Sequence, residues 1–409
     1  MKKLIPLILA AALTLAACAS APDTASTPLA NSTPEPTAAT TPAPTTAPFY
    51  PVANSYNNGD TYYAFVHRGE DSLLLKTDYA AATQTVNCAV PGCAHDSDAC
   101  PAYFTDDPGC NLVITDDPLR VCHVEDRGCP VQIYTVDPAA GKAMQEINGV
   151  GNCDIAYCDG TALYGIDKTV LPSEATPACR IDLATGQAET FVLEPTEHYL
   201  AGFDGALLTC RYVADAPLPT DAEQYAAAIQ NATVEIDRLD PRTGARTGLT
   251  ERPYSNADYE KNGCFIGVYN GKAYFEEREI IPGSGFRRTV LTTVDAEGRA
   301  ETVWDPWPQA EWVLGDDGGR YIWLYRDNYN TSYAARALLD TETGQITPVT
   351  QALQTGSGAV SLRGKAHDGR WLVVIGADSA GRTTDYGLID ADQFAAGSTD
   401  WQPVAMWQG

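Results

Sequence analysis

Short hydrophobic segments alternate with two kinds of polar turn signal along most of the chain. The first signal is an Asn-Gly or Asp-Gly pair, which tolerates the positive φ angles of a tight turn and therefore predicts two antiparallel strands joined there. Flanking segments such as 155–157 and 162–164 have the apolar and aromatic composition of strands. The first signal occurs at Asn58-Gly59, Asp159-Gly160, Asp204-Gly205, Asn270-Gly271, Asp317-Gly318 and Asp368-Gly369.

The second signal is an Asp followed within a few residues by a Gly. The Asp side chain accepts backbone hydrogen bonds at the start of such a turn, and the Gly takes the left-handed position that closes it. Strand-like segments, for example 131–136 and 290–294, adjoin these turns, so the second signal also predicts hairpins. It occurs at Asp137–Gly141, Asp182–Gly186, Asp240–Gly244, Asp295–Gly298 and Asp340–Gly344.

Because the two signals alternate, each repeating unit is predicted to contain four strands. The wide interval after Asn58 leaves room for one degenerate unit near Asp117-Pro118. Seven such units of roughly 50 residues each predict an all-β fold, a β-propeller with seven four-stranded blades spanning residues 49–409. Six or eight blades remain alternatives. A pair of β-sandwiches is another, although sandwiches do not require this regular alternation.

One interruption of the strand pattern predicts a short helix. Thr220-Asp221-Ala222-Glu223 has the spacing of a capping box, and it leads into the helix-favouring segment 224–229. We expect this helix in the long connection of the fourth unit. It is either a surface decoration or part of a binding mouth.

The first residues of the chain have the features of an export signal. Lys2 and Lys3 precede an apolar stretch, 4–15, that is too short to span a membrane as a helix. The run Leu15-Ala16-Ala17-Cys18 resembles the lipobox of bacterial lipoproteins. The resemblance implies that residues 1–17 are a signal peptide and that Cys18 is lipidated and anchors the chain at the extracellular face of the cell membrane. An ordinary cleaved secretory signal is the alternative.

Residues 18–48 are predicted to form a disordered stalk behind the lipidated cysteine. From Ala19 to Pro48, 26 of 30 residues are Ala, Pro, Ser or Thr, and seven of these are prolines. Such a segment cannot bury enough apolar surface to fold. Its prolines favour extended conformations, with a reach of at most roughly 90 Å.

The charge balance excludes one class of partner. The full chain has a net charge of −26, which becomes −28 once Lys2 and Lys3 are removed. Phosphate binding requires clustered Lys and Arg, so we expect no nucleic-acid partner. Anionic lipid headgroups are disfavoured for the same reason, which leaves the lipid on Cys18 as the expected contact with the membrane.

Cysteine and histidine are concentrated in one short segment, Cys88-x4-Cys93-x-His95-x4-Cys100, which follows the last strand of the first unit. Three thiolates and an imidazole are a ligand set for tetrahedral zinc, and the spacings are compatible with one site. Twelve cysteines are present in all, of which eleven follow Cys18 and nine of those lie between Cys88 and Cys179. Because export permits oxidation, disulfides among these and the downstream cysteines are the favoured interpretation, and a metal site or inert thiols are the alternatives.

The same segment carries a family resemblance. Cys88, Pro91, Cys93, His95, Cys100 and Ala102 match a motif of uncharacterised β-propeller-like lipoproteins of Gram-positive, clostridial gut bacteria. Because no activity is established for that family, the resemblance implies class and location alone.

The sequence leaves two functions open. The first is a non-catalytic propeller that binds a protein or carbohydrate ligand or supports protein assembly. It is favoured because no phosphate-binding loop, dinucleotide fingerprint, His-Glu-x-x-His or Gly-x-Ser-x-Gly motif occurs. The second is a glycan-active hydrolase or lyase at the cell surface, whose carboxylates would be scattered among the blades. No catalytic residue is assigned, and zinc is the only cofactor indicated. The seven tryptophans predict either a sugar-stacking surface or packing between blades.

Overall fold

The computed structural model describes residues 49–51, 53–69, 71–105, 111–115, 119–124, 130–167, 169–170, 174–229, 232–253, 261–280, 287–304, 312–326, 336–356, 358–379 and 382–408. The chain divides into two units, Met1–Pro44 and Thr45–Gly409. The predicted signal peptide, Cys18 and the stalk to residue 48 lie outside the described residues.

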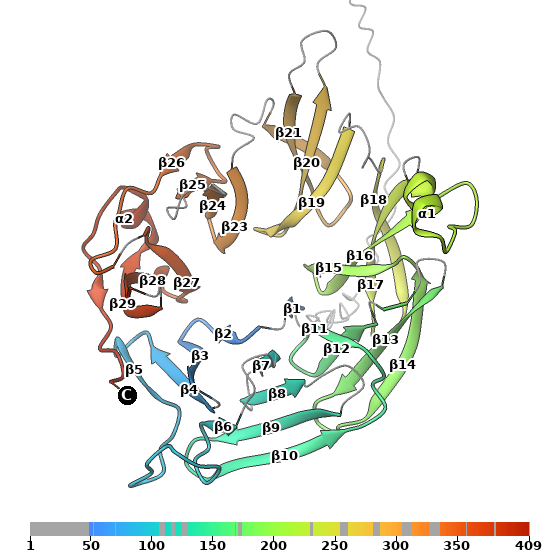
Figure 1. Ribbon diagram of the computed structural model, residues 1–409. Helices are drawn as coiled ribbons and strands as arrows, with labels where there is room; N and C mark the ends of the chain where they lie inside the picture. Colours follow the sequence, from blue (N-terminus) through green and yellow to red (C-terminus); the bar gives the residue numbers. More distant parts are fainter. Residues whose placement is uncertain are drawn as a thin grey trace, which may run out of the picture. The chain divides into compact units, whose positions relative to one another are not determined.

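The second unit is a ring of seven blades (Figure 1), which confirms the predicted propeller and its blade number. Each blade is an antiparallel sheet of four strands in sequence order. The first strand of each blade lies towards the centre of the ring, and the last strand lies at its outer edge (Figure 1).

Blades 1 to 4 are formed by the following strands. Blade 1 contains β2 (Ser55–Asn57), β3 (Thr61–Arg68), β4 (Asp71–Asp78) and β5 (Thr83–Val86), and β6 (Tyr103–Thr105) also pairs with β4. Blade 2 contains β7 (Asn111–Thr115), β8 (Arg120–Val124), β9 (Val131–Asp137) and β10 (Gly141–Ile147). Blade 3 contains β11 (Asp154–Cys158), β12 (Ala162–Ile166), β13 (Ala175–Asp182) and β14 (Ala188–Pro195), and β1 (Tyr50–Pro51) pairs with β11. Blade 4 contains β15 (His198–Phe203), β16 (Ala206–Val213), β17 (Thr233–Asp240) and β18 (Ala245–Pro253).

Blades 5 to 7 complete the ring. Blade 5 contains β19 (Lys261–Tyr269), β20 (Lys272–Ile280), β21 (Arg287–Val294) and β22 (Ala300–Trp304). Blade 6 contains β23 (Trp312–Gly318), β24 (Tyr321–Arg326), β25 (Arg336–Asp340) and β26 (Ile346–Pro348). Blade 7 contains β27 (Ser361–Lys365), β28 (Arg370–Ala377), β29 (Thr383–Asp390) and β30 (Gln402–Pro403).

The two turn signals fall at corresponding places in the blades. All five Asp-to-Gly turns join a third strand to a fourth, as predicted. Five of the six Asn-Gly or Asp-Gly pairs join a first strand to a second, and Asn270 and Gly271 have the φ angles of 49° and 69° that this turn requires. Asp117-Pro118 lies outside the described residues, but β7 to β10 confirm the unit predicted around it.

The sixth pair, Asp317-Gly318, is a correction to the predicted turn. Strand β23 continues through it, Gly318 pairs with Tyr321, and the turn consists of the two residues between them. Gly319, with φ of 85°, takes the left-handed position. Gly318 instead packs closely against Trp371, since a Cβ at this position would lie 2.9 Å from the Trp371 ring. Of two adjacent glycines, the second therefore forms the turn.

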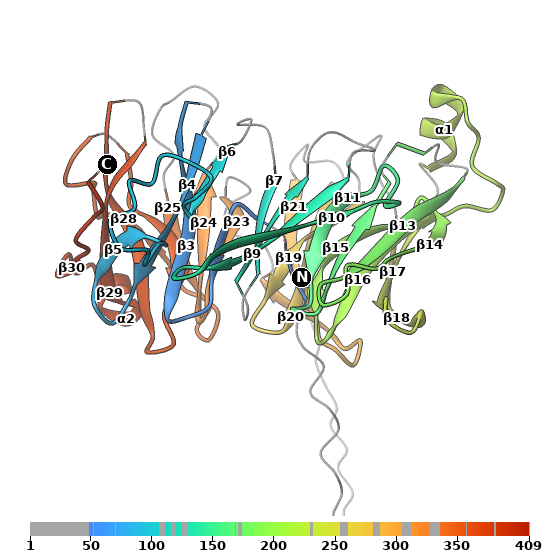
Figure 2. The ribbon, with the colours of Figure 1, turned by 90° about the horizontal axis from the view of Figure 1, so that it is seen from below.

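The antiparallel order gives the ring two different faces. The turns after the first and third strands of each blade lie on one face, which we call the short-turn face, and the remaining connections lie on the opposite, long-loop face. Helix α1 (Ala222–Ile229) follows a second strand, in the connection of blade 4 where the sequence predicted it. Helix α2 (Ala391–Ala395) follows a third strand. Figure 2 shows α1 and α2 at opposite faces of the ring.

The hydrophobic core is divided among the blade interfaces. The described residues form seven buried clusters, and each cluster joins two neighbouring blades. Trp323 and Trp371 are almost fully buried between blades 6 and 7 together with Trp401. These three tryptophans pack between or within blades, so the packing alternative holds for them. The cohesion of the ring comes from these interfaces, because each blade buries both faces of its sheet against neighbours.

Blades 1 and 7 close the ring without sharing a strand, because each is built from its own segment. The C-terminal tail provides the link instead. The Ala405 N–H donates to the Ala82 carbonyl, and the Ala405 carbonyl accepts from the Gln84 N–H. Asn57 and Tyr79 add side-chain hydrogen bonds at the same junction.

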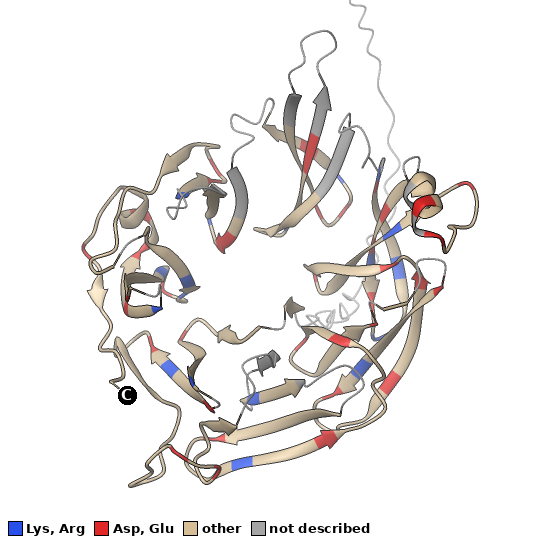
Figure 3. Cartoon of the chain, in the orientation of Figure 1, with Lys and Arg blue, Asp and Glu red and all other residues tan. Residues whose placement is uncertain are grey.

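The N-terminal end of the described chain lies inside the ring. Strand β1 pairs with β11, the innermost strand of blade 3. The chain then continues into β2 of blade 1. Around the ring, the described Lys and Arg residues are spread among Asp and Glu (Figure 3). None of the helices formed by the described residues is both long and apolar enough to cross a membrane.

Candidate metal centre

The Cys/His segment is a closed excursion from the outer edge of blade 1. It leaves after β5 and returns as β6, and Figure 1 shows it projecting from the outer edge of the ring. Both of its ends bond to the same residue: the Asn87 N–H donates to the Leu74 carbonyl, and the Leu74 N–H donates to the Ala102 carbonyl, at 2.9 and 2.8 Å. The residues between are a loop with no regular secondary structure and with closely spaced ends.

The four predicted ligands come together in this loop. One ligand atom each from Cys88, Cys93, His95 and Cys100 lies within 4.8 Å of the other three. The His95 Nδ1 atom is 3.3 Å from the Cys100 Sγ atom. Zinc bound by sulfur at about 2.3 Å and by nitrogen at about 2.0 Å keeps its ligands roughly 3.5–3.8 Å apart. Ligand pairs near the 4.8 Å limit would have to draw together, and His95 and Cys100 would have to move slightly apart, to form a tetrahedral site.

The backbone of the loop is bent to bring the ligands inward. His95 has a φ of 57° and Gly92 a φ of 71°. The left-handed region is unfavourable for a residue with a Cβ, so its use at His95 marks a constrained position. The Arg68 guanidinium donates to the His95 carbonyl at 2.7 Å and holds this bend. The Cys93 N–H bonds to Val90 and the Cys100 N–H to Ser97, so two local turns carry two of the sulfur ligands.

The sulfur atoms differ in environment. Cys100 is buried, and this burial raises its pKa to about 12. The pKa of Cys93 is lowered because the backbone N–H of His95 donates to its sulfur. A bound zinc ion would supply the positive charge that a buried thiolate needs, because coordinated thiols are deprotonated.

The loop also packs against blade 2. The Ala89 N–H donates to the Pro138 carbonyl in the turn between β9 and β10. Lys142 at the start of β10 forms an ion pair with Asp98 at 3.2 Å, and its ammonium lies 4.5 Å from the centre of the Phe104 ring. If the loop is held in one conformation, these contacts connect the outer edges of blades 1 and 2.

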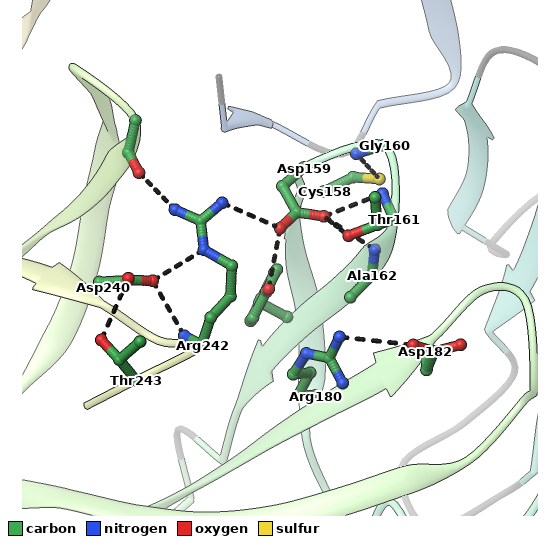
Figure 4. Close-up of polar contacts among 12 residues, drawn as sticks. Cys158, Asp159, Gly160, Thr161, Ala162, Arg180, Asp182, Asp240, Arg242 and Thr243 are labelled. Carbon is green, nitrogen blue, oxygen red and sulfur yellow. Dashed lines mark hydrogen bonds and ion pairs between the residues drawn. The ribbon is translucent and has the colours of Figure 1, made fainter. Parts of the chain in front are cut away.

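The sequence did not predict a second buried group of polar side chains, in which Arg242 and Asp159 lie beside the buried Phe49. Phe49 is buried where the chain enters the ring, with its ring 5.2 Å from Tyr164 and 5.0 Å from the Arg242 guanidinium. Figure 4 shows Arg242 between Asp159 of blade 3 and Asp240 of blade 4. Asp159 is 1% exposed and also accepts hydrogen bonds from backbone N–H groups in its own turn. The turn aspartates at 159 and 240 were predicted, but their meeting at Arg242 depends on how the two blades pack.

Sequence reasoning also missed a pairing of His198 with Cys210. The Cys210 Sγ lies 3.0 Å from His198 Nε2, and the Nδ1 atom of the same ring is 3.1 Å from the Thr196 carbonyl. His198 lies six residues before Asp204 and Cys210 five residues after Gly205, and a β-bulge between Tyr199 and Ala201 brings the two opposite each other. The predicted turn alone would therefore not have paired them. Cys210 is only 5% exposed, so the pair has the geometry of a nucleophile and base without the access to a substrate.

A hollow of about 580 Å³ lies on the two outer strands of blade 4. Its lining includes the carboxylates of Glu235, Asp237 and Glu251. Burial raises the pKa of Asp237, although Arg211 and Arg246 act in the opposite direction. The buried Glu197 carboxylate bonds to Arg246 at 2.8 Å on the same blade. A carboxyl group with a raised pKa that lines a hollow is a candidate functional residue.

The remaining predicted cysteines fall into two groups. Cys18, Cys110 and Cys129 lie outside the described residues, as does the side chain of Cys264. The other eight, all within the described part of the chain, form no disulfide bond in the structure. Cys88, Cys93 and Cys100 are among them, and together with His95 they form a group that could hold a metal ion.

No protein-family model matches the chain, and no curated protein matches it in sequence. Similar solved structures include the β-propeller domain of the trilobed protease from Pyrococcus furiosus, which has an open velcro topology. It is 12% identical with a TM-score of 0.43, over 73% of this chain and 86% of that one. A prolyl endopeptidase is 16% identical with a TM-score of 0.50, over 88% of this chain and 49% of that one. An oligogalacturonate lyase in complex with manganese is 13% identical with a TM-score of 0.40, over 86% of both chains.

The similarity to the prolyl endopeptidase, at a TM-score of 0.50 and 16% identity, agrees with the propeller fold and shows nothing finer. The chain spans about half the length of the prolyl endopeptidase and of the Pyrococcus horikoshii acylaminoacyl peptidase that it resembles, at 49% and 52% of those chains. The fold and the site together define a seven-bladed β-propeller with a cluster of three cysteines and one histidine on its first blade.

Proposed function

We propose that the chain is an exported lipoprotein, anchored through a lipid on Cys18, whose propeller binds a ligand or assembles with another protein. The observation that carries this proposal is the docking of the chain at Phe49. Phe49, the first described residue, is buried between blades 3 and 4 at the short-turn face. A tether there leaves the opposite face, with its long connections and helix α1, open to a partner.

The Cys/His cluster supports a structural role for a metal ion and not a catalytic one. Four protein ligands fill a tetrahedral zinc site, whereas catalytic zinc sites keep one position for water or substrate. Cys88, Cys93, His95 and Cys100 would hold the ion in the loop that joins blades 1 and 2. The ion would supply folding energy to a loop that has no regular secondary structure of its own.

The anchoring is tested by expressing the full chain in a Gram-positive host and separating cells from medium. The proposal predicts that the wild-type protein stays with the membrane fraction and incorporates a labelled fatty acid. The matched variant Cys18→Ala is expected to lose the label and to appear in the medium. Wild-type protein that is unlabelled and fully released would contradict the anchoring.

A second candidate function is favoured by the hollow on blade 4. Asp237 has a raised pKa beside Glu235 and Glu251, and such a set of carboxylates can serve a glycan-active hydrolase or lyase. Asp237 would act as the proton donor.

A glycan-array screen combined with a reducing-sugar assay separates the two candidates. Binding without turnover supports the ligand-binding propeller. Turnover that falls by at least about 100-fold in Asp237→Asn supports the enzyme. The variant Glu301→Gln, at an exposed carboxyl on blade 5, is the control for a general effect of lost charge. Absence of both binding and turnover would favour a protein partner over a glycan.

A further inference from the structure

Two thiols outside the Cys/His cluster meet inside blade 3. Cys153 immediately precedes β11, and Cys179 lies on β13, so one strand, β12, separates them. The Cys153 sulfur reaches β13, where it lies 4.0 Å from the Pro177 carbonyl oxygen, two residues before Cys179. The proximity of the two thiols shifts their pKa values in opposite directions, down for Cys153 and up for Cys179. Cys153 is 8% exposed and Cys179 is fully buried, within the cluster that joins blades 2 and 3.

The intervening strand is shaped to let the two side chains meet. Gly165 on β12 pairs with Ile155 on one side and with Cys179 on the other. A Cβ at Gly165 would lie 3.1 Å from the Cys179 Sγ and 2.9 Å from the Asp154 carbonyl oxygen. Its φ is not in the left-handed region, so the glycine is required for space and not for a turn.

We propose that Cys153 and Cys179 form a disulfide bond in the exported protein, which staples the inner edge of blade 3 across β12 to its third strand. An exported chain meets an oxidising environment, where contacting thiols become disulfides. The inference uses the export that is part of the proposed function, but the pairing itself depends only on the fold.

The chemistry is a thiol–disulfide exchange with a protein or small-molecule disulfide as oxidant. The Cys153 thiolate attacks one sulfur of that disulfide, and the other sulfur leaves as a thiolate. Cys179 then loses its proton to water and attacks the Cys153 sulfur of the mixed disulfide, which releases the second thiolate. Two protein thiols are oxidised to one disulfide, and the oxidant is reduced to two thiols.

The order of attack follows from the environments of the two sulfurs. Cys153 is the more exposed thiol, and the hydrogen bond from Cys179 lowers its pKa. The same contact raises the pKa of Cys179. Cys158 has different partners, since the Gly160 N–H donates to its sulfur at 3.2 Å and the Tyr50 hydroxyl also contacts it. Cys158 is therefore expected to stay reduced.

Peptide mapping tests the pairing. The full chain is exported by a secreting bacterium, its free thiols are trapped with N-ethylmaleimide under denaturing conditions, and it is digested with trypsin without reduction. Cleavage at Lys142, Lys168 and Arg180 separates the two cysteines. We expect peptides 143–168 and 169–180 to be joined through Cys153 and Cys179, with the maleimide on Cys158. In Cys179→Ser the joined species should vanish and Cys153 should carry maleimide.

A second preparation makes the test independent of export. The same chain is produced in a reducing cytoplasm and refolded in a buffer of reduced and oxidised glutathione. The joined peptides are expected here too, and reduction of the refolded protein should lower Tm by about 5 °C, as for a disulfide closing a loop of about 27 residues. The double variant Cys153→Ser/Cys179→Ser should show no change in Tm on reduction. If both cysteines are alkylated after refolding, the proposal is overturned. If they are joined only after refolding, the fold allows the pairing, but the proposal that it forms in the exported protein is overturned.

Discussion

The backbone of Phe49 lies directly against Gly202: a Cβ at Gly202 would lie 2.0 Å from the Phe49 carbonyl oxygen. Gly202 is on β15 of blade 4, and Phe49 is where the chain enters the ring. Gly202→Ala is therefore expected to displace the entry segment and to lower the free energy of unfolding by more than about 2 kcal/mol. Urea denaturation measures this loss.

The control for this substitution is Gly248→Ala on the same blade. A Cβ at Gly248 would meet only the Asp237 carboxylate, at an ordinary contact distance of 3.7 Å. Its effect on stability should stay within about 0.5 kcal/mol. Equal losses in the two variants would mean that the contact with Phe49 is unimportant.

Arg242 is expected to matter more for stability than an exposed arginine. Arg242→Ala removes the ion pair to Asp159, which is 1% exposed, and the contact of the guanidinium with Phe49. Because the carboxylate stays buried, we expect a loss of about 2 kcal/mol in the free energy of unfolding. Arg299→Ala is the comparison, since Arg299 is 75% exposed beside its acidic partners and should contribute less than about 0.5 kcal/mol. Similar losses of unfolding free energy in Arg242→Ala and Arg299→Ala would contradict a special role for the buried ion pair of Arg242.

The C-terminal tail should be needed to close the ring. Deletion of residues 404–409 removes the buried Val404 side chain and both backbone hydrogen bonds of Ala405 to blade 1. The expected loss is about 3 kcal/mol, together with faster proteolysis at the junction of blades 1 and 7. Deletion of Gln408 and Gly409 alone should change neither stability nor proteolysis. A full-deletion variant as stable as the wild type would show that the interface alone closes the ring.

The turn aspartates should make stability depend on pH in the acidic range. A hydrogen bond from Arg320 lowers the pKa of Asp340, and the backbone N–H of Thr185 lowers that of Asp182. Folded-state pKa values below the unfolded value mean that the stabilisation is present above about pH 4 and is lost as the pH falls through the folded values. Asp340→Asn should therefore cost about 1 kcal/mol at pH 7 and progressively less below pH 4. If urea unfolding shows that Asp340→Asn loses the same free energy of unfolding at pH 7 and pH 2.5, the ionised carboxylate is not the source of the stabilisation.

The sequence predicted the features that depend on neighbouring residues. Asn270-Gly271 and Asp240–Gly244 determine turns by local backbone chemistry, so the blades and their number could be inferred. The Cys/His cluster was predicted because its four ligands lie between Cys88 and Cys100, in a single loop.

Features that depend on packing between distant segments could not be predicted. The pairing of β1 with β11 and the bond of Ala405 to Ala82 join residues whose partners leave no local signal in the sequence. The contact of Cys153 with Cys179 depends on Gly165 in the strand between them, which a count of cysteines cannot reveal.

The central claim, that the Cys/His loop is a closed metal site on a β-propeller, is tested most directly by metal content. The full chain should be purified without reductant or chelator and measured by inductively coupled plasma mass spectrometry. The account predicts about one zinc ion per chain, at least a tenfold loss in Cys88→Ser and Cys93→Ser, and no loss in the control Cys210→Ser. Wild-type protein without metal, in which Cys88, Cys93 and Cys100 are joined in disulfides or freely alkylated, would contradict it.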